Sequence, residues 1–156
     1  MQNIRSIAGS LLLTLGATLS ACGTSSNNPT APVTQPSNVP SFITSGTWVV
    51  SSLMQRTEDK ASQFSGYAFA FTGVGGESGT VVATNNGASI SGTWTHSPAV
   101  TYYGSTSTES ITLSLGTASP FVRLTKTWNV VSITSTTLTL VNPEVLEDEH
   151  LVFSRQ

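Results

Sequence analysis

The chain has 156 residues, of which only 9% are charged, and six basic against eight acidic residues give a net charge of −2. That balance excludes binding to nucleic acid through a basic surface, because such proteins need clustered Lys and Arg to neutralise phosphates. The single cysteine excludes a disulfide within one chain, so stability must come from packing.

Residues 1–21 have the pattern of a bacterial lipoprotein signal peptide. Arg5 supplies positive charge, a short apolar run covers 7–18, and the motif Leu-Ser-Ala-Cys ends at Cys22. A lipoprotein signal peptidase cuts in front of a cysteine whose sulfur carries diacylglycerol. We therefore expect cleavage before Cys22, lipid (including palmitate) on that residue, and a mature net charge of 5 − 8 = −3.

The alternative is an ordinary secretory signal cut after Ala21, which would leave Cys22 as a free thiol. Leu19 argues against this alternative, because that peptidase prefers a small side chain three positions before the cut. Acyl chains at Cys22 would anchor the protein to a membrane of the cell envelope, since each buried methylene contributes about 0.8 kcal/mol. Gly23 is not the aspartate that retains lipoproteins in the inner membrane, so in a host with two membranes we expect the outer one.

Residues 22–41 are expected to form a tether. The segment 23–41 has four prolines, no charged residue and almost no apolar side chain, so it cannot bury enough surface to order itself. Phe42 and Ile43 end this polar run. We therefore predict that the folded domain comprises residues 42–156.

Alternating apolar and polar residues predict strands throughout this domain. In the segment 66–72, for example, Tyr67, Phe69 and Phe71 share one face. The connection 97–108 is harder to assign, with a short strand at 100–103 as an alternative, and no sustained helical period is found. The predicted strands are 46–55, 66–72, 79–84, 88–96, 109–115, 124–133, 136–141 and 149–155.

The predicted fold class is all-β: an eight-stranded antiparallel up-and-down barrel that follows a signal peptide and a linker. Short strands joined by short turns satisfy their edges most simply by closing into a barrel. Such a barrel is just wide enough to be filled by side chains or to hold one small ligand, and the inward aromatics favour filling. The expected inward residues are Trp48, Val50, Phe69, Phe71, Val82, Ile90, Trp94, Ile111, Leu113, Leu115, Trp128, Val130, Leu138, Leu140, Leu151 and Phe153.

The domain resembles the small bacterial lipocalin-like lipoproteins of the calycin type, over residues 46–155. No single motif is specific, and it is the order and spacing of the motifs that carry the resemblance. Avidins also begin a strand with Gly-Thr-Trp, but their later ligand-contacting segments have no match here. The motifs are GTW at 46–48, YxFxF at 67–71, GTW at 92–94, LxKxWxVxSI at 124–133, TLTL at 137–140 and LVFSR at 151–155.

The resemblance implies a structural role for two residues. In lipocalins the tryptophan of the first motif closes one end of the barrel, and a basic residue near the last strand lies over it. This implies that Trp48 and Arg155 form a stacked pair, a cation–π contact of about 0.5 to 2 kcal/mol. Fraying of the chain end, which would leave Arg155 in solvent, is the alternative.

The sequence offers little catalytic or metal-binding chemistry. His96 and His150 have no second ligand at metal spacing, and no serine lies in a nucleophile elbow. The acidic segment 144–149 lacks the glycine of a calcium loop and is expected to be a solvated hairpin loop. The glycine-rich segment 73–79 lacks the lysine of a phosphate loop. We therefore expect a protein that is not an enzyme and that has no metal and no cofactor.

Two functions stay open at this stage. The first is binding of a small hydrophobic ligand at the barrel mouth, with Phe69, Phe71, Trp94 and Tyr102 as the expected contacts. The second is a structural or interaction protein whose filled barrel presents loops such as 97–108 to an envelope partner of unknown identity. In both, the lipid on Cys22 makes the membrane itself a partner.

Overall fold

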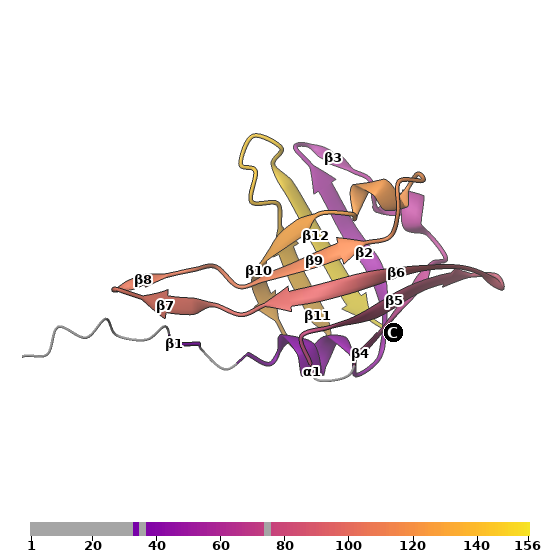
Figure 1. Cartoon of the computed structure of the whole chain (residues 1–156). Helices are drawn as coiled ribbons and strands as arrows, with labels where there is room; N and C mark the ends of the chain where they lie inside the picture. Colours follow the sequence, from indigo (N-terminus) through magenta and orange to yellow (C-terminus); the bar gives the residue numbers. More distant parts are fainter. Residues whose placement is uncertain (1–32, 35–36, 74–75) are drawn as a thin grey trace, which may run out of the picture.

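A closed antiparallel β-barrel forms the body of the chain (Figure 1). The structure is a computed structural model that describes residues 33–34, 37–73 and 76–156. Eight strands follow one another around the barrel in chain order, and the last pairs with the first, which confirms the predicted fold class. The strands are β2 (Thr47–Gln55), β4 (Ala68–Gly73), β5 (Ser78–Asn85), β6 (Ala88–Ser97), β9 (Ser110–Ser114), β10 (Thr127–Ile133), β11 (Thr137–Val141) and β12 (Glu149–Arg155).

The apolar faces of these strands meet inside the barrel. All three tryptophans are 0% exposed, and the predicted inward residues of β2, β4, β9, β11 and β12 are buried. Val82 is an exception to the prediction: it points outward, and its neighbours Val81 and Ala83 are buried instead. The cause is the register of β4 with β5, which pairs Val81 with inward-facing Phe71. Ile90 and Val130 are only partly buried against the core.

A bulge in β2 explains a core residue that simple alternation misses. The register between β2 and β12 shifts at Val152/Phe153, so that Phe153 pairs with Val50 while Val152 pairs with Ser52. The extra residue reverses the alternation after Val50. Leu53 therefore points inward and is only 2% exposed.

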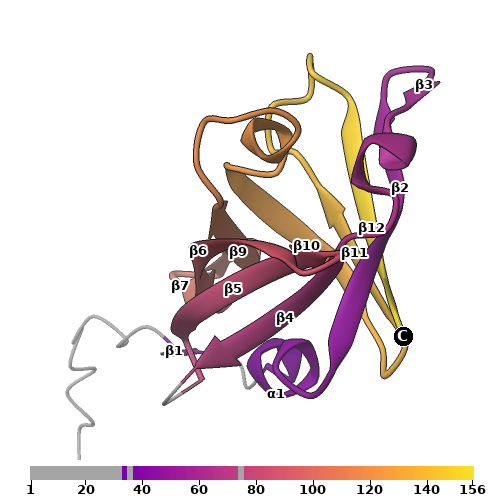
Figure 2. The ribbon, with the colours of Figure 1, turned by 90° about the vertical axis from the view of Figure 1, so that its right-hand side faces the viewer.

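A short helix, α1 (Val39–Ile43), covers one end of the barrel, at the bottom of Figure 2. Val39 and Ile43 are 1% and 0% exposed, and Pro40 favours a helix start because its missing N–H is not needed there. α1 thus begins three residues before 42, where the predicted domain starts. The predicted tether contains enough apolar surface, in Val39, to bury its last residues.

Two 3-10 turns cover the opposite end, η1 (Ala61–Phe64) and η2 (Phe121–Arg123), at the top of Figure 2. Phe64 and Phe121 meet edge to face at 6.1 Å between ring centroids. Leu124, predicted to begin a strand, follows η2 and is 0% exposed. The two ends are called the α1 end and the η end below.

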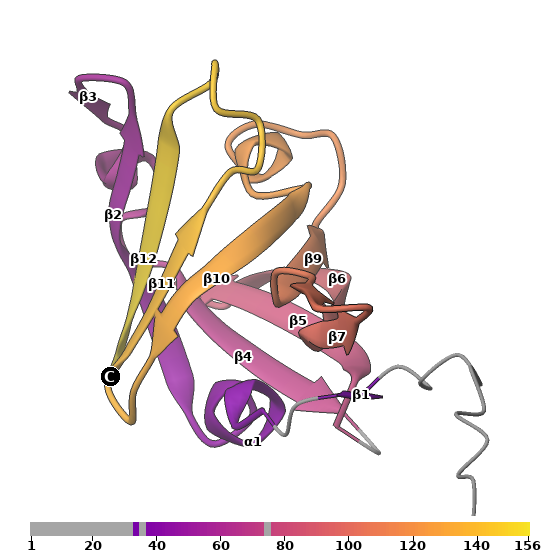
Figure 3. The same cartoon turned by 90° about the vertical axis from the view of Figure 1, so that its left-hand side faces the viewer.

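A second, small sheet lies at the side of the barrel (Figure 3). Its strands are β1 (Val33–Thr34), β7 (Val100–Tyr102) and β8 (Ser105–Thr106), in the order β1-β7-β8. The β7–β8 hairpin projects to the left in Figure 1. The strand that was an alternative at 100–103 is therefore present. At the η end, β3 (Glu58–Asp59) adds a short pairing to β2.

Candidate functional site

The four residues predicted to bind a ligand occupy two different places. Phe69, Phe71 and Trp94 are 0%, 2% and 0% exposed inside the barrel. Phe71 and Trp94 meet edge to face at 6.3 Å between ring centroids, and Phe69 packs on Phe153 at 5.5 Å. Tyr102 lies outside, on the β7–β8 hairpin, and is 43% exposed. The first three contribute to the packed interior, and Tyr102 belongs to a separate surface.

Trp94 packs against Gly73, at a point where neighbouring strands carry two glycines. The register places Gly73, Gly79 and Trp94 in one row across β4, β5 and β6. A Cβ atom at Gly73 would lie 3.1 Å from the indole ring, and Nε1 of the indole donates to the carbonyl of Thr72 at 3.0 Å. On the outer face, a shallow open hollow follows the same strands and is lined mainly by threonines.

The β7–β8 hairpin carries exposed aromatic side chains at its tip. Tyr103 is 68% exposed and meets Tyr102 edge to face at 4.2 Å between centroids. Tyr103 and Gly104 have φ of 49° and 77°, the left-handed backbone of a tight hairpin turn. The backbone N–H of Ser107 donates to the Val100 carbonyl at 2.9 Å, which closes the hairpin base.

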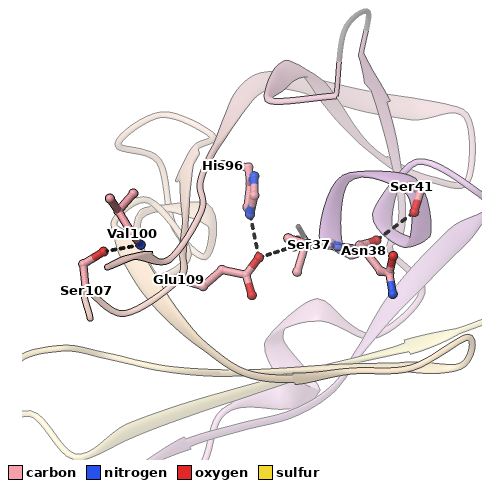
Figure 4. A network of polar contacts seen from close by, with 8 residues as sticks. Ser37, Asn38, Ser41, His96, Val100, Ser107 and Glu109 are labelled. Atoms are coloured by element: carbon pink, nitrogen blue, oxygen red, sulfur yellow. Dashed lines mark hydrogen bonds and ion pairs between the residues drawn. The ribbon is translucent and has the colours of Figure 1, made fainter. Parts of the chain in front are cut away.

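A polar cluster joins the base of this hairpin to the segment before α1 (Figure 4). Nε2 of His96, at the end of β6, lies 2.7 Å from Oε1 of Glu109, and the Ser37 hydroxyl donates to the same oxygen. His96 is only 7% exposed, whereas the Glu109 side chain is 24% exposed. The backbone N–H of His96 donates to the carbonyl of Glu77 at 2.6 Å. The cluster therefore ties three separate segments together at the α1 end.

The geometry of this cluster suits positioning better than nucleophilic catalysis. The Ser37 hydroxyl donates to Glu109 and not to the imidazole, so His96 is not placed to accept the serine proton. Nδ1 of His96 is buried and has no hydrogen-bond partner among the described residues. What the arrangement does is hold Ser37, and with it the start of α1, against β6 and β9.

A second buried polar cluster lies at the η end. Glu149 is 5% exposed, pairs with Lys126, and accepts a hydrogen bond at 2.7 Å from the side-chain amide of Asn142. The Lys126 ammonium also lies 5.4 Å from the ring centroid of Trp128. Both contacts are made by Oε2 of the Glu149 carboxylate, so the buried charge has a cation and a neutral donor beside it, as burial of a charge requires. Glu149 belongs to this cluster and not to the solvated acidic loop that the sequence predicts.

Trp48 and Arg155 are register partners on β2 and β12, as the predicted pairing requires. The indole Nε1 of Trp48 donates to the carbonyl of Ile43 in α1 at 2.8 Å. The Arg155 guanidinium lies instead over Gly46, where a Cβ atom would be 2.5 Å from its Nε. The expected cation–π contact between the two is not among the contacts of the described residues. At this end α1 covers Trp48.

Some of the predicted features lie outside the described residues, among them Cys22, the signal peptide and most of the tether. Within 33–34, 37–73 and 76–156, no group of three or more His, Cys, Asp or Glu side chains could hold a metal ion. No helix in that part of the chain is long and apolar enough to span a bilayer.

The sequence reasoning missed Tyr103 and the His96–Glu109–Ser37 cluster. Tyr103 has a readable signal, because two tyrosines followed by a glycine inside an uncharged loop indicate a hairpin turn with exposed rings. The cluster has none, since its members are 72 residues apart in the widest pair and meet only through the fold.

Comparisons with known proteins add little to this description. No family model matches the chain, and no curated protein matches it. Among solved structures, the chain is similar to the crystal structure of an uncharacterized protein from Bacteroides eggerthii DSM 20697. The identity is 14%, the match covers 71% of this chain and 98% of that chain, and the TM-score is 0.43.

Proposed function

We propose that this protein is a lipid-anchored lipoprotein of a bacterial cell envelope whose lipocalin-like barrel is a non-enzymatic interaction module. Its contacts are made by the outside of the barrel at the β7–β8 hairpin, and not by a ligand inside. The lipid on Cys22 would hold the module at the membrane surface.

One contrast carries this proposal. The interior of the barrel is occupied by large side chains, with Trp48, Trp94 and Trp128 all 0% exposed. Tyr102 and Tyr103, in contrast, are exposed at the tip of a hairpin that projects from the body. Exposed tyrosines are typical of contact surfaces, because a large rigid ring gains contact area at little cost in conformational entropy. The packing thus supports the interaction hypothesis over the internal ligand.

The test is made on the membrane-bound protein and compares the tip of the β7–β8 hairpin with the interior of the barrel. In intact cells, a photoreactive amino acid in place of Tyr103 is expected to form crosslinks to neighbouring molecules of the envelope. The same group in place of exposed Val145, at the η end, is expected to form few such crosslinks. Titration with fatty acids is expected to leave tryptophan fluorescence unchanged. Quenching of the tryptophans by fatty acids, without adducts at residue 103, would instead establish the internal ligand.

Anchoring is tested separately with Cys22→Ala. We expect the wild-type chain to incorporate labelled palmitate and to remain with membranes, and the variant to accumulate as an uncleaved precursor without label. A variant that is processed to the same size as the wild-type chain would show ordinary secretion. That result would remove the anchor from the proposal while leaving the hairpin contacts to be judged by crosslinking.

A further inference from the structure

The strand register shows from which side the chain enters the small sheet. β1 is antiparallel to β7, with Val33 opposite Thr101 and Thr34 opposite Val100. Because β7 runs from Val100 toward the hairpin tip, the earlier residue of β1 is the one nearer the tip. The chain therefore reaches the barrel from the tip side of the hairpin.

The length of the intervening chain sets how far the tip can be from the predicted anchor. Ten residues separate Cys22 from Val33 in the sequence. A fully extended chain spans at most 3.3 to 3.6 Å per residue, so Val33 lies within about 40 Å of the lipidated cysteine. An anchor at Cys22 therefore keeps the hairpin close to the bilayer surface.

The charges are distributed unevenly between the two ends of the barrel. Glu77, Glu109 and Arg155 lie at the α1 end, and Glu109 is engaged with His96. The remaining charged side chains of the described residues gather at the η end, on β3, η2 and the strand ends and loops beside them. They are Arg56, Glu58, Asp59, Lys60, Arg123, Lys126, Glu144, Glu147, Asp148 and Glu149. The α1 end is thus the end that loses least hydration on approaching a membrane.

The hairpin tip has the chemistry of a membrane interface. Residues 97–108 contain no charged side chain, and Ser and Thr surround the two exposed tyrosines. Tyrosine is enriched where bilayer meets water, because its ring is apolar and its hydroxyl stays hydrated. The tight turn holds Tyr103 outward at a left-handed φ of 49°.

We propose that the tip of the β7–β8 hairpin docks on the lipid bilayer that holds the Cys22 anchor, with the rings of Tyr102 and Tyr103 at head-group level. This inference rests on the lipidation in the proposed function. Two tyrosines bind a free bilayer only weakly. The tether makes the contact intramolecular, which raises its effective concentration without any new contact. Figure 1 shows the hairpin projecting to one side of the barrel and the charged η end at the top, so the docked tip and the charged end are separate parts of the surface.

The experiment places a fluorescent label beside the tyrosines. Full-length lipidated protein carrying Ser105→Cys is purified from membranes and labelled with an environment-sensitive dye, since lipid occupies the sulfur of Cys22. Ser105 is exposed and is the register partner of Tyr102. The protein is reconstituted in phosphatidylcholine vesicles that contain a doxyl-labelled lipid. Val145→Cys, on the exposed loop of the η end, is the matched control label.

We expect doxyl groups near the lipid head groups to quench the label at residue 105 strongly and the label at residue 145 little. Tyr102→Ser combined with Tyr103→Ser is expected to abolish most of the quenching at residue 105, with near-ultraviolet circular dichroism of the barrel unchanged. Because the tip is uncharged, added salt is expected to leave the quenching unchanged.

The outcomes separate the hairpin contact from the anchor. Protein that floats with the vesicles but shows no quenching at residue 105, or equal quenching with and without the tyrosines, overturns docking and leaves the anchor intact. A hairpin whose partner is another protein gives the first of these results, because the vesicles contain no other protein. Protein that fails to float at all overturns the anchor and the docking together.

Discussion

Glu109 and His96 form a polar pair at the α1 end, with Oε1 of the carboxylate 2.7 Å from Nε2 of the imidazole. His96 lies in β6 and Glu109 directly precedes its neighbour β9, where the two strands diverge into the β7–β8 hairpin. Since Ser37 donates to the same carboxylate oxygen, the pair also fixes the chain where it enters the barrel. The base of the hairpin and the start of the domain are thereby held together.

Replacing Glu109 by Gln is expected to destabilise the domain by about 1 kcal/mol, because a neutral amide oxygen is a weaker acceptor than a carboxylate oxygen. The change weakens the acceptor shared by His96 and Ser37. Urea unfolding followed by tryptophan fluorescence measures the free energy of unfolding. Glu77→Gln is the control, because only the backbone carbonyl of that exposed residue contacts His96. Equal unfolding midpoints for wild type and Glu109→Gln would contradict the assigned role.

Gly79→Ala is expected to disrupt the barrel where β4 and β5 come closest. A Cβ atom there would lie 1.7 Å from the Thr72 carbonyl oxygen and 2.7 Å from the Gly73 Cα, so backbone must move. Overpacking costs about 1 to 3 kcal/mol where side chains can adjust, and backbone contacts leave less room, so we expect a loss at or above the top of that range.

Gly87→Ala provides the matched comparison for Gly79→Ala. Gly87 has a φ of 84° but nothing within 4 Å of its added Cβ, so only the backbone conformation is penalised, by about 1 to 2 kcal/mol. Thermal unfolding ranks the two variants. If Gly87→Ala proves as damaging as Gly79→Ala, close approach of the strands is not the cause.

Asp59 is expected to make stability depend on acid pH. Backbone N–H groups of Ala61, and then of Leu53, donate to its carboxylate and hold the pKa of Asp59 below its usual value of 3.8. A carboxyl whose folded pKa is lowered contributes stability above the unfolded pKa, and that stability is lost as the pH falls through the folded value. Wild type should therefore lose more stability below about pH 4 than Asp59→Asn, which cannot titrate.

The measurement for Asp59 is a series of urea unfolding curves from neutral to acid pH on both proteins. Ala61 and Leu53 keep their backbone donors in Asp59→Asn, because the amide oxygen can still accept. The difference in unfolding free energy between the two proteins should shrink as the pH falls. A difference that is constant with pH would show that the carboxylate charge plays no part.

Lys126→Met is expected to destabilise the η end by about 3 kcal/mol, because it leaves the buried Glu149 carboxylate with Asn142 as its main partner. Adding Glu149→Gln to this variant should restore part of the loss, since the uncompensated charge is then removed. Chemical unfolding of the two single variants and the double variant gives the coupling free energy. Strict additivity of the two changes would show that the pair is not coupled.

Much of the fold can be predicted from the sequence because strand periodicity is local. The alternation in 66–72 identifies the buried face of β4, where Phe69 and Phe71 point inward as expected. The buried face is predicted wrongly where it depends on the pairing register between two strands. Val82 and Val81 are adjacent valines in one strand, and only pairing with β4 determines which of them is buried. Leu53 requires knowledge of a bulge that the partner strand creates.

The two ends of the barrel are harder to predict from the sequence than its strands. Phe64, Phe121 and Leu124 lie in or beside turns that fold over the η end, where neither strand nor helix periodicity applies. Of the candidate site, Tyr102 can be found as an aromatic residue in a loop. The pairing of His96 with Glu109 depends on how β6 and β9 are aligned, which no short motif encodes.

The seam between β12 and β2 joins residues more than a hundred positions apart, as the hydrogen bond from Ser154 to Ser51 shows. Pairings of such long separation form slowly, and the barrel cannot close until the seven residues of β12 are in place. A chain truncated before Glu149 would leave β2 and β11 with bare edges facing each other across a gap. Such edges recruit strands from other molecules, so loss of this terminal segment should turn a self-contained barrel into an aggregating one.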